Sequence, residues 1–271
     1  MNGAGNRFIL IDVRGQAGLL EIGAETVRHW GRQHAFDQLL ALEDSDTGDA
    51  FMRIWNADGD EVGACGNGTR AAGWVLLQES GADTVAVATA GGLLFASQAG
   101  QMQVSVDMGE PRLDWQDIPL SREMDTREMD VSFEAAGLVI DRPGAVNMGN
   151  PHAVFFIRDV ETFPVDRLGP EVELDPVFPE RVNASFAQIY DRRHIRLRVW
   201  ERGVGITLAC GTAACATLVA AHRRGLADRQ ASIMADGGEL HIEWREQDNH
   251  IIMTGPVEDE GEIHLSTGTA R

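Results

Sequence analysis

The chain has 271 residues, of which 44% are hydrophobic and 24% are charged, a composition that predicts a folded protein rather than a disordered segment. Its net charge of -19 repels phosphate backbones, so we expect no nucleic-acid partner. All 23 basic residues are arginines. A chain without lysine cannot form the internal Schiff base of a pyridoxal enzyme, and it lacks the lysines that P-loop proteins and protein kinases require.

The predicted elements have the same order in both halves of the chain, judged from apolar periodicity. In the first half we expect strands over 8–13 and 51–55, a helix over 69–78, and strands over 84–88, 93–97 and 103–107. In the second half we expect strands over 153–157 and 195–200, a helix over 212–223, and strands over 232–235, 239–244 and 250–254. The polar segment 111–118 is a predicted crossover, and 262–265 is a predicted final strand.

Four short motifs recur at offsets of 144 to 146 residues and indicate an internal duplication. They are Gly-Asn at 5–6 and 149–150, Ala-Cys-Gly at 64–66 and 209–211, Gly-Gly at 91–92 and 237–238, and VSVDMG at 104–109 with IIMTG at 251–255. We therefore predict a mixed α/β fold with α+β character, in which each of two pseudo-symmetric halves curls a mixed sheet around a buried helix. The first half is expected at 1–112 with the C-terminal strand 256–271, the second at 113–255, and the active-site cleft between them.

The wider composition favours a cytoplasmic protein that does not enter a membrane. The longest nearly apolar run, 208–221, is too short to span a bilayer, and the opening MNGAGNRFILID has no secretory pattern. Three cysteines make no disulfide scaffold and are typical of a reducing compartment.

Cys65 and Cys210 are the candidate catalytic residues, because both directly precede a predicted buried helix. The positive end of a helix favours a thiolate, so we expect a lowered thiol pKa, and the following glycines allow N–H groups to hold a carboxylate. Two such thiols suit racemisation or epimerisation without a cofactor, in which one removes a proton and the other returns one on the opposite face.

Other interpretations of these residues are weaker. Cys215 lies inside an apolar helix and is expected to be a core residue. Because CxxC and HExxH are both absent from the sequence, we predict no metal site. The segment from Gly66 to Ala71 matches a relaxed dinucleotide fingerprint, but it follows a polar loop rather than an apolar strand.

Several motifs closely resemble those of the diaminopimelate epimerase family over nearly the whole chain and in the same order. They are Gly-x-Gly-Asn at 3–6, DQLL at 37–40, NADG at 56–59, EVGACGNGTR at 61–70, MGNPH at 148–152, Asn183, and WERG at 200–203 with ACGT at 209–212. Proline racemase-type enzymes and the phenazine-biosynthesis isomerase share the duplicated fold that this resemblance implies.

The resemblance implies a site, an activity and a partner. Cys65 and Cys210 would be the acid–base pair, assisted by His152 and Glu201, in converting LL-2,6-diaminopimelate to meso-diaminopimelate without a cofactor, for lysine and peptidoglycan precursors. The implied partner is a small amino acid, and the implied assembly is a homodimer. The implied substrate-binding residues are Asn6, Gln38, Asn56, Gly66, Asn67, Asn150, Asn183, Glu201, Arg202, Gly211 and Thr212.

Two alternatives stay open from the sequence, namely a proline or hydroxyproline racemase and a thiol redox or binding protein without isomerase activity. The chain also departs from the commonest family pattern at Arg7, where an acidic residue is usual, and at Ile206, where glutamate is frequent.

Overall fold

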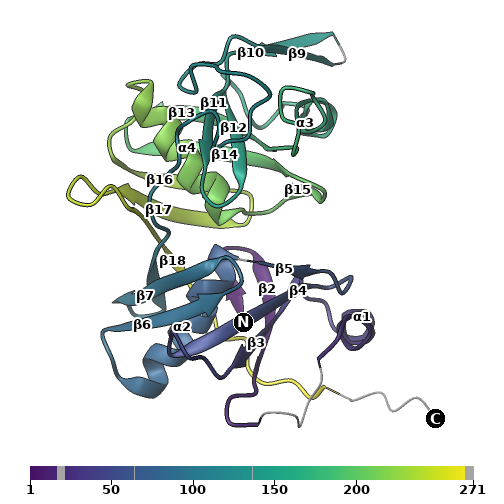
Figure 1. The fold of residues 1–271 in the computed structure, drawn as a ribbon, viewed down its shortest axis with the longest axis vertical. Helices are drawn as coiled ribbons and strands as arrows, with labels where there is room; N and C mark the ends of the chain where they lie inside the picture. The colour runs from purple at the N-terminus through teal and green to yellow at the C-terminus, as the bar shows by residue number, and fades with distance from the viewer. Residues whose placement is uncertain (17–21, 64, 136, 266–271) are drawn as a thin grey trace. The chain divides into compact units, whose positions relative to one another are not determined.

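The computed structural model describes residues 1–16, 22–63, 65–135 and 137–265 (Figure 1). The chain divides into two compact units, the first containing residues 1–107 and the C-terminal segment from 254, the second containing residues 108–253. Ala64 of the first Ala-Cys-Gly motif lies outside the described residues, as do 266–271 of the predicted C-terminal strand.

The first unit is a mixed sheet with strand order β1-β2-β3-β4-β6-β7-β8. Strands β2 and β3 are parallel, β4 is antiparallel to β3 and parallel to β6, and β6, β7 and β8 form an antiparallel meander. The elements are β1 (Asn2–Gly3), β2 (Asn6–Asp12), α1 (Ala24–Gln33), β3 (Gln38–Glu43), β4 (Ala50–Asn56), β5 (Glu61–Val62), α2 (Gly66–Ser80), β6 (Thr84–Thr89), β7 (Gly92–Gly100) and β8 (Gln103–Asp107).

The second unit has the strand order β11-β12-β13-β14-β16-β17, and a separate hairpin is formed by β9 and β10. Its elements are β9 (Ser132–Ala135), β10 (Leu138–Asp141), β11 (Gly144–Asn147), β12 (Pro151–Phe156), α3 (Val165–Glu173), β13 (Asn183–Asp191), β14 (His194–Glu201), β15 (Gly205–Thr207), α4 (Gly211–Arg223), β16 (Gln230–Ala235) and β17 (Gly238–Trp244). Strand β18 (Ile251–Pro256) includes the boundary at which the chain returns to the first unit.

The two units share one topology. In the second unit β12 and β13 are parallel, β14 is antiparallel to β13 and parallel to β16, and β16 and β17 form a hairpin. This is the pattern of β2, β3, β4, β6 and β7, with α1 and α3 at corresponding crossovers. The predicted mixed α/β fold class is confirmed.

Each unit packs one largely buried helix against its sheet, in addition to its crossover helix. Helix α2 contacts β6, β7 and β8, whereas α4 contacts β11, β12, β16 and β17 (Figure 1). Both helices are largely buried, as their nearly continuous apolar sequences predict. The strands alternate as expected, since Ile195, Leu197 and Val199 of β14 are buried between less buried arginines.

The sequence prediction of these helices was incomplete. Helix α2 begins at Gly66, three residues before the expected start, because glycine has a low intrinsic helix propensity that the fold overrides here. It ends at Ser80, and its C-cap residue Gly81 adopts φ 65° and donates its N–H to the Leu77 carbonyl. The crossover helices α1 and α3 were missed, since both are short and mostly polar.

The predicted strand over 262–265 is wrong, because these residues carry no strand structure. Glu258 forms an isolated bridge with Asn2, and the chain then turns at Gly261, whose N–H is accepted by the Asp259 carboxylate. Residues 258–264 are exposed and Leu265 alone of the predicted strand packs against the core, so the segment lacks the buried face that an alternating strand needs.

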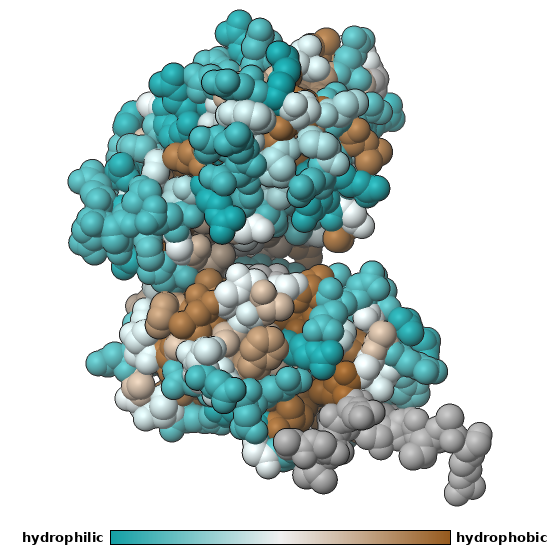
Figure 2. All heavy atoms as spheres, viewed as in Figure 1, coloured by the Kyte–Doolittle hydropathy of each residue, from teal (hydrophilic) through white to brown (hydrophobic). Residues whose placement is uncertain are grey.

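Some apolar residues lie on the surface of both units, and Figure 2 shows those on one face of the molecule. The large exposed examples include Leu93 and Phe95 of β7, and Val204, Ile206 and Leu208 around β15. Among the helices of the described residues, none has the length and apolar character needed to cross a membrane.

The close approach of α2 to β7 gives a stability prediction. In a solvent-exposed helix, replacing glycine by alanine stabilises the helix by about 1 kcal/mol. At Gly73 a Cβ would lie 2.4 Å from the Ala96 Cβ, so G73A should instead lower the free energy of unfolding by about 1–3 kcal/mol through overpacking. Urea unfolding of G73A and of the double variant G73A/A96G tests this. The double variant should recover part of the loss, and a G73A protein as stable as wild type would contradict the packing.

Candidate active site

Cys65 is the N-cap residue of α2 and is partly buried. Its Sγ accepts the Gly68 N–H at 3.3 Å, and its carbonyl accepts the Thr69 N–H at 2.8 Å. A Cβ at Gly68 would lie 3.0 Å from the Leu40 Cδ2, so glycine lets the first turn approach β3. The first turn contains no acidic residue, which leaves its positive end available to an external anion.

Asn67 in that first turn is held by a chain of side-chain hydrogen bonds. Fully buried Arg70 donates from Nη1 to the Asn67 Oδ1 at 2.8 Å, and the Asn67 Nδ2 donates to the Asn6 Oδ1 at 2.6 Å. Because Arg70 can only donate, it fixes which end of the Asn67 amide faces Asn6. The predicted substrate-binding residues Asn6 and Asn67 are therefore adjacent.

Gln38 and Asn56 form a second pair in the first unit. They are directly opposed on β3 and β4, and the Gln38 Nε2 donates to the Asn56 Oδ1 at 3.0 Å. The Gln38 Oε1 is buried and makes no hydrogen bond within the described part of the chain. Such an acceptor can receive an ammonium N–H of a ligand.

Cys210 is the N-cap residue of α4 and is 8% exposed. Its Sγ lies 3.4 Å from the Thr212 Oγ1, and its thiol also interacts with the largely buried Glu201 carboxylate at the end of β14. The Thr207 hydroxyl donates to the same carboxylate. The predicted residues Glu201, Cys210 and Thr212 thus form one group, together with Gly211 in the first turn of α4.

The expected lowering of the thiol pKa is wrong for Cys210. Burial raises its pKa well above the usual range, and the negative charge of Glu201 raises it further, against the smaller effects of Thr212 and the Ala213 N–H. Burial also raises the pKa of Glu201, while Thr207 and Cys210 oppose that rise. Desolvation therefore outweighs the helix end, and Cys210 is a protonated thiol in the substrate-free chain.

His152 is fully buried on β12, where its Nε2 lies 2.9 Å from the Asn150 Oδ1. Burial lowers the pKa of His152 to about 3, and the positive charge of Arg202 acts in the same direction. The ring is therefore neutral at physiological pH. Its Nδ1 has no hydrogen-bond partner among the described residues, so His152 can polarise a neighbour but does not carry a charge.

Asn183 and Arg202 are the remaining predicted site residues. Asn183 stands opposite His152 in the parallel register of β12 and β13. Its Nδ2 donates to the Pro151 carbonyl at 2.9 Å, and its Oδ1 accepts the Arg202 N–H at 2.9 Å. The Arg202 guanidinium is exposed and donates to the Glu180 carbonyl at 3.0 Å. Asn183 therefore anchors the turn that carries Arg202.

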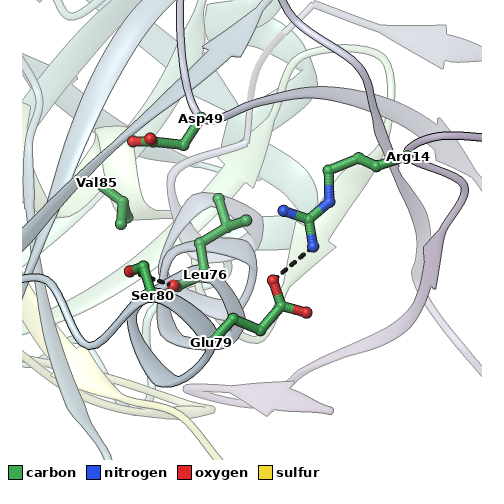
Figure 3. Close-up of a pocket in the computed structure, with 6 residues that line it drawn as sticks. All are labelled: Arg14, Asp49, Leu76, Glu79, Ser80 and Val85. Carbon is green, nitrogen blue, oxygen red and sulfur yellow. Dashed lines mark hydrogen bonds and ion pairs between the residues drawn. The ribbon is translucent and has the colours of Figure 1, made fainter.

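A separate hollow of the first unit contains none of these residues (Figure 3). Arg14 and Glu79 pair across it at 2.6 Å, and its other lining residues are Asp49, Leu76, Ser80 and Val85. Its charged groups already pair with the protein, since Asp49 accepts the Ala86 N–H at 2.7 Å. The hollow carries no sign of catalysis.

Comparison with solved structures defines the class of fold. A probable proline racemase from Agrobacterium radiobacter has a TM-score of 0.65 and 17% identity, covering 98% of this chain and 92% of its own. A phenazine biosynthesis protein from Bacillus anthracis has a TM-score of 0.62 and 16% identity, covering 93% of this chain and 91% of its own. At such identities the likeness concerns the fold, which is the duplicated fold of these proteins.

Comparison of sequences defines the family. The family described as diaminopimelate epimerase matches residues 1–113 and 144–259. A diaminopimelate epimerase from Phenylobacterium zucineum is 50% identical over 268 residues, covering 97% of this chain and 96% of the relative. Another from Methylocella silvestris is 48% identical over 270 residues, covering 98% and 93%. The chain belongs to the diaminopimelate epimerase family, which confirms the resemblance seen in its motifs.

Three residues without a role in the sequence analysis hold the predicted site residues or the turn beside them. Arg70 orients Asn67, Thr207 donates to Glu201, and buried Glu173 accepts hydrogen bonds beside the Glu201–Arg202 pair. The only signal in the sequence is the position of Arg70 within an otherwise apolar helix. The partners of Glu173 come from elements that pack only in the folded chain.

The depressed pKa of His152 predicts a pH-dependent stability. The unfolded imidazole titrates near 6.5 and the folded one near 3, so the unfolded chain binds one more proton between these values. The stability gap between wild type and H152Q should therefore narrow as pH falls from 6.5, by about 1.4 kcal/mol per unit. Urea unfolding from pH 7 to 4 tests this, with the exposed-residue variant H194Q as control. A gap that does not change with pH would contradict a buried neutral His152.

The Glu201–Cys210 contact predicts a shift in thiol titration. In a C65A/C215A background, Cys210 is the sole thiol, and its thiolate can be followed by ultraviolet absorbance. E201Q removes the negative charge that disfavours the thiolate, so its titration midpoint should move to lower pH. An unchanged or higher midpoint would contradict the conclusion that the charge of Glu201 disfavours the thiolate.

Proposed function

We propose that this protein is a diaminopimelate epimerase that interconverts LL-2,6-diaminopimelate and meso-diaminopimelate without a cofactor. The single observation that carries the proposal is that both Cys65 and Cys210 cap buried helices whose first turns contain no acidic residue. The names of the family and of its relatives identify the substrate. Proton NMR of the purified, cofactor-free protein with LL-diaminopimelate tests it, and the meso isomer should accumulate.

In the proposed reaction the two thiols act on opposite faces of one α-carbon. The Cys65 thiolate takes the α-proton and becomes a thiol, while the Cys210 thiol gives its proton to the other face and becomes a thiolate. The raised pKa of Cys210 makes it the acid in this direction. Glu201 would polarise the Cys210 thiol through their contact, and after product release Cys65 would lose its proton to solvent while the Cys210 thiolate regains one. The reverse reaction exchanges the roles.

The difficult step is to stabilise negative charge beside a carboxylate. An α-proton of an amino acid is far less acidic than a thiol, so N–H donors must stabilise the developing carbanion. We propose that the first turns of α2 and α4 bind the α-carboxylate, through Gly66 and Asn67 and through Gly211 and Thr212. Neutral His152 would assist by polarising the substrate, because an unprotonated ring adds no competing charge.

The distal end of the substrate would be bound by polar side chains and one cation. Arg202 suits bidentate pairing with the distal carboxylate. The amide oxygens of Asn6, Gln38, Asn56, Asn150 and Asn183 suit the distal ammonium and orient the chain. The buried Gln38 Oε1 supports this role, since it is available as an acceptor.

We further propose that the protein acts in the cytoplasm, in lysine and peptidoglycan precursor synthesis, as a homodimer. The composition of three cysteines supports a reducing compartment. The substrate is a small amino acid, and the net charge of -19 argues against a nucleic-acid partner.

A proline-type racemase is the second candidate, because structures of that class share the fold. One of them is a hydroxyproline epimerase from Agrobacterium vitis with bound trans-4-hydroxy-L-proline, at a TM-score of 0.63, 17% identity, and 94% and 86% coverage. Thiol alkylation separates the candidates. Protection of Cys65 and Cys210 by meso-diaminopimelate supports the proposal, protection by proline supports the racemase, and protection by neither favours a non-catalytic thiol protein.

The two-thiol mechanism predicts the effect of removing either cysteine. C65A and C210A should each lower kcat by about 10²-fold or more, because general acid–base groups contribute that much. Their circular dichroism should match that of the wild type.

C215A is the matched control, since Cys215 is a fully buried thiol of α4 just over one turn beyond Cys210. It should cost about 1 kcal/mol of stability and leave turnover intact. A C210A protein that epimerises at a near-normal rate would rule out the proposed acid.

A further inference from the structure

The end of β14 and the turn after it carry Glu201 and Arg202, and a buried carboxylate of another element accepts a hydrogen bond from the residue on each side of this pair. Glu173, the last residue of α3, is 5% exposed. Its Oε2 accepts the Trp200 Nε1–H at 2.7 Å, and its Oε1 accepts the Gly203 N–H at 2.9 Å. The two donors immediately flank Glu201 and Arg202.

We propose that Glu173 is a positioning residue for substrate binding, which fixes the turn so that the Arg202 guanidinium can receive the distal carboxylate. This inference rests on the proposed function, because it concerns the same substrate. Glu173 acts on Arg202 through the two residues to which it is hydrogen-bonded, Trp200 and Gly203.

The packing of α3 shows why the carboxylate is held in one place. A Cβ at Gly169 would lie 2.4 Å from the Trp200 Cγ, so the helix backbone rests on the indole. Glu173 follows one turn later and reaches the indole N–H and the turn beyond it. The indole, the helix end and the turn are therefore packed and hydrogen-bonded to one another.

Packing of α3 against β14 does not by itself require a carboxylate at Glu173. A buried carboxylate is costly unless each oxygen accepts hydrogen bonds, and an apolar residue would join α3 to β14 at lower cost. The Arg181 Nη1 lies 3.6 Å from Glu173, but Arg181 is 58% exposed and contributes little. The two N–H donors of the turn are therefore the main partners of the charge.

Three further hydrogen bonds hold the turn around Arg202. Gly203 adopts φ 75°, and the Val204 N–H donates to the Glu201 carbonyl at 3.1 Å, which closes the turn. Asn183 accepts the Arg202 N–H, whereas Glu180 accepts from its guanidinium only through a backbone carbonyl. Loss of the Gly203 anchor would let the Arg202 backbone rotate about Asn183.

The test is steady-state kinetics of E173Q with LL-diaminopimelate. A glutamine has one acceptor oxygen, so either the indole or the Gly203 N–H must face an amide NH₂. We expect KM to rise by about tenfold or more with kcat within about threefold, because a misplaced Arg202 weakens ground-state and transition-state binding alike. The control E171Q changes an exposed glutamate on the same helix and should leave KM unchanged.

A second variant separates positioning from general destabilisation. W200F removes the competing indole donor, so the single amide oxygen that E173Q leaves can accept the Gly203 N–H again. In E173Q/W200F the KM should therefore be lower than the product of the two single effects predicts. Multiplicative effects, or an E173Q protein with wild-type KM, would overturn the proposal.

The failure of this inference is distinct from failure of the proposed function. A wild-type protein that converts LL- to meso-diaminopimelate while E173Q keeps its KM refutes only the role of Glu173. A folded wild-type protein without any conversion refutes the function and, with it, the positioning role. The Trp200 indole N–H resonance, assigned with W200F, should move upfield in E173Q, and an unmoved resonance counts against the contact itself.

Discussion

Helices α2 and α4 each begin at a glycine directly after a cysteine, and this arrangement constrains the rest of each unit. A helix that starts without an acidic residue presents N–H groups and a positive end that can attract an anion. The helix must also be buried, which explains its apolar sequence and the close approach of Gly73 to Ala96. The sheet, the glycines and the caps together hold a thiol at the positive end of a buried helix.

In the second unit, burial outweighs the effect that the helix end alone would have on the pKa of the thiol. The helix end alone would favour a thiolate at Cys210, but burial and the Glu201 carboxylate favour the protonated thiol. Nearby, burial and the charge of Arg202 keep His152 neutral. The substrate-free chain therefore holds a protonated thiol, a carboxylate and an uncharged imidazole, a state that is compatible with the proposed return of a proton to carbon.

The sequence predicted the parts of this account that depend on local patterns. Apolar runs gave the strands around β4, β6, β14 and β16, and the repeated Ala-Cys-Gly motifs placed both thiols before a helix. The predicted start of α2 at residue 69 lies after the observed start at Gly66, because Gly66 and Gly68 are poor helix formers that the fold nevertheless places in a helix.

Features that depend on packing were not accessible from the sequence. Helices α1 and α3 are short and mostly polar, so the few apolar residues on the buried face of each make too short a pattern to stand out. The roles of Arg70 and Glu173 arise only from partners distant in the chain or from burial. The direction of the Cys210 pKa was wrong because the depth of burial cannot be read from flanking residues. The predicted strand at 262–265 failed because residues 262–264 are exposed and only Leu265 packs against the core of the first unit.

The most direct measurement of the central claim is isotope incorporation during turnover in D₂O. If Cys65 and Cys210 are independent bases, the abstracted hydrogen stays on one sulfur while the product receives a solvent-exchanged deuteron from the other. Mass spectrometry of separated LL and meso isomers at low conversion should find deuterium in the new product and almost none in recovered substrate. Product that retains the original hydrogen at the inverted carbon would contradict a two-thiol mechanism.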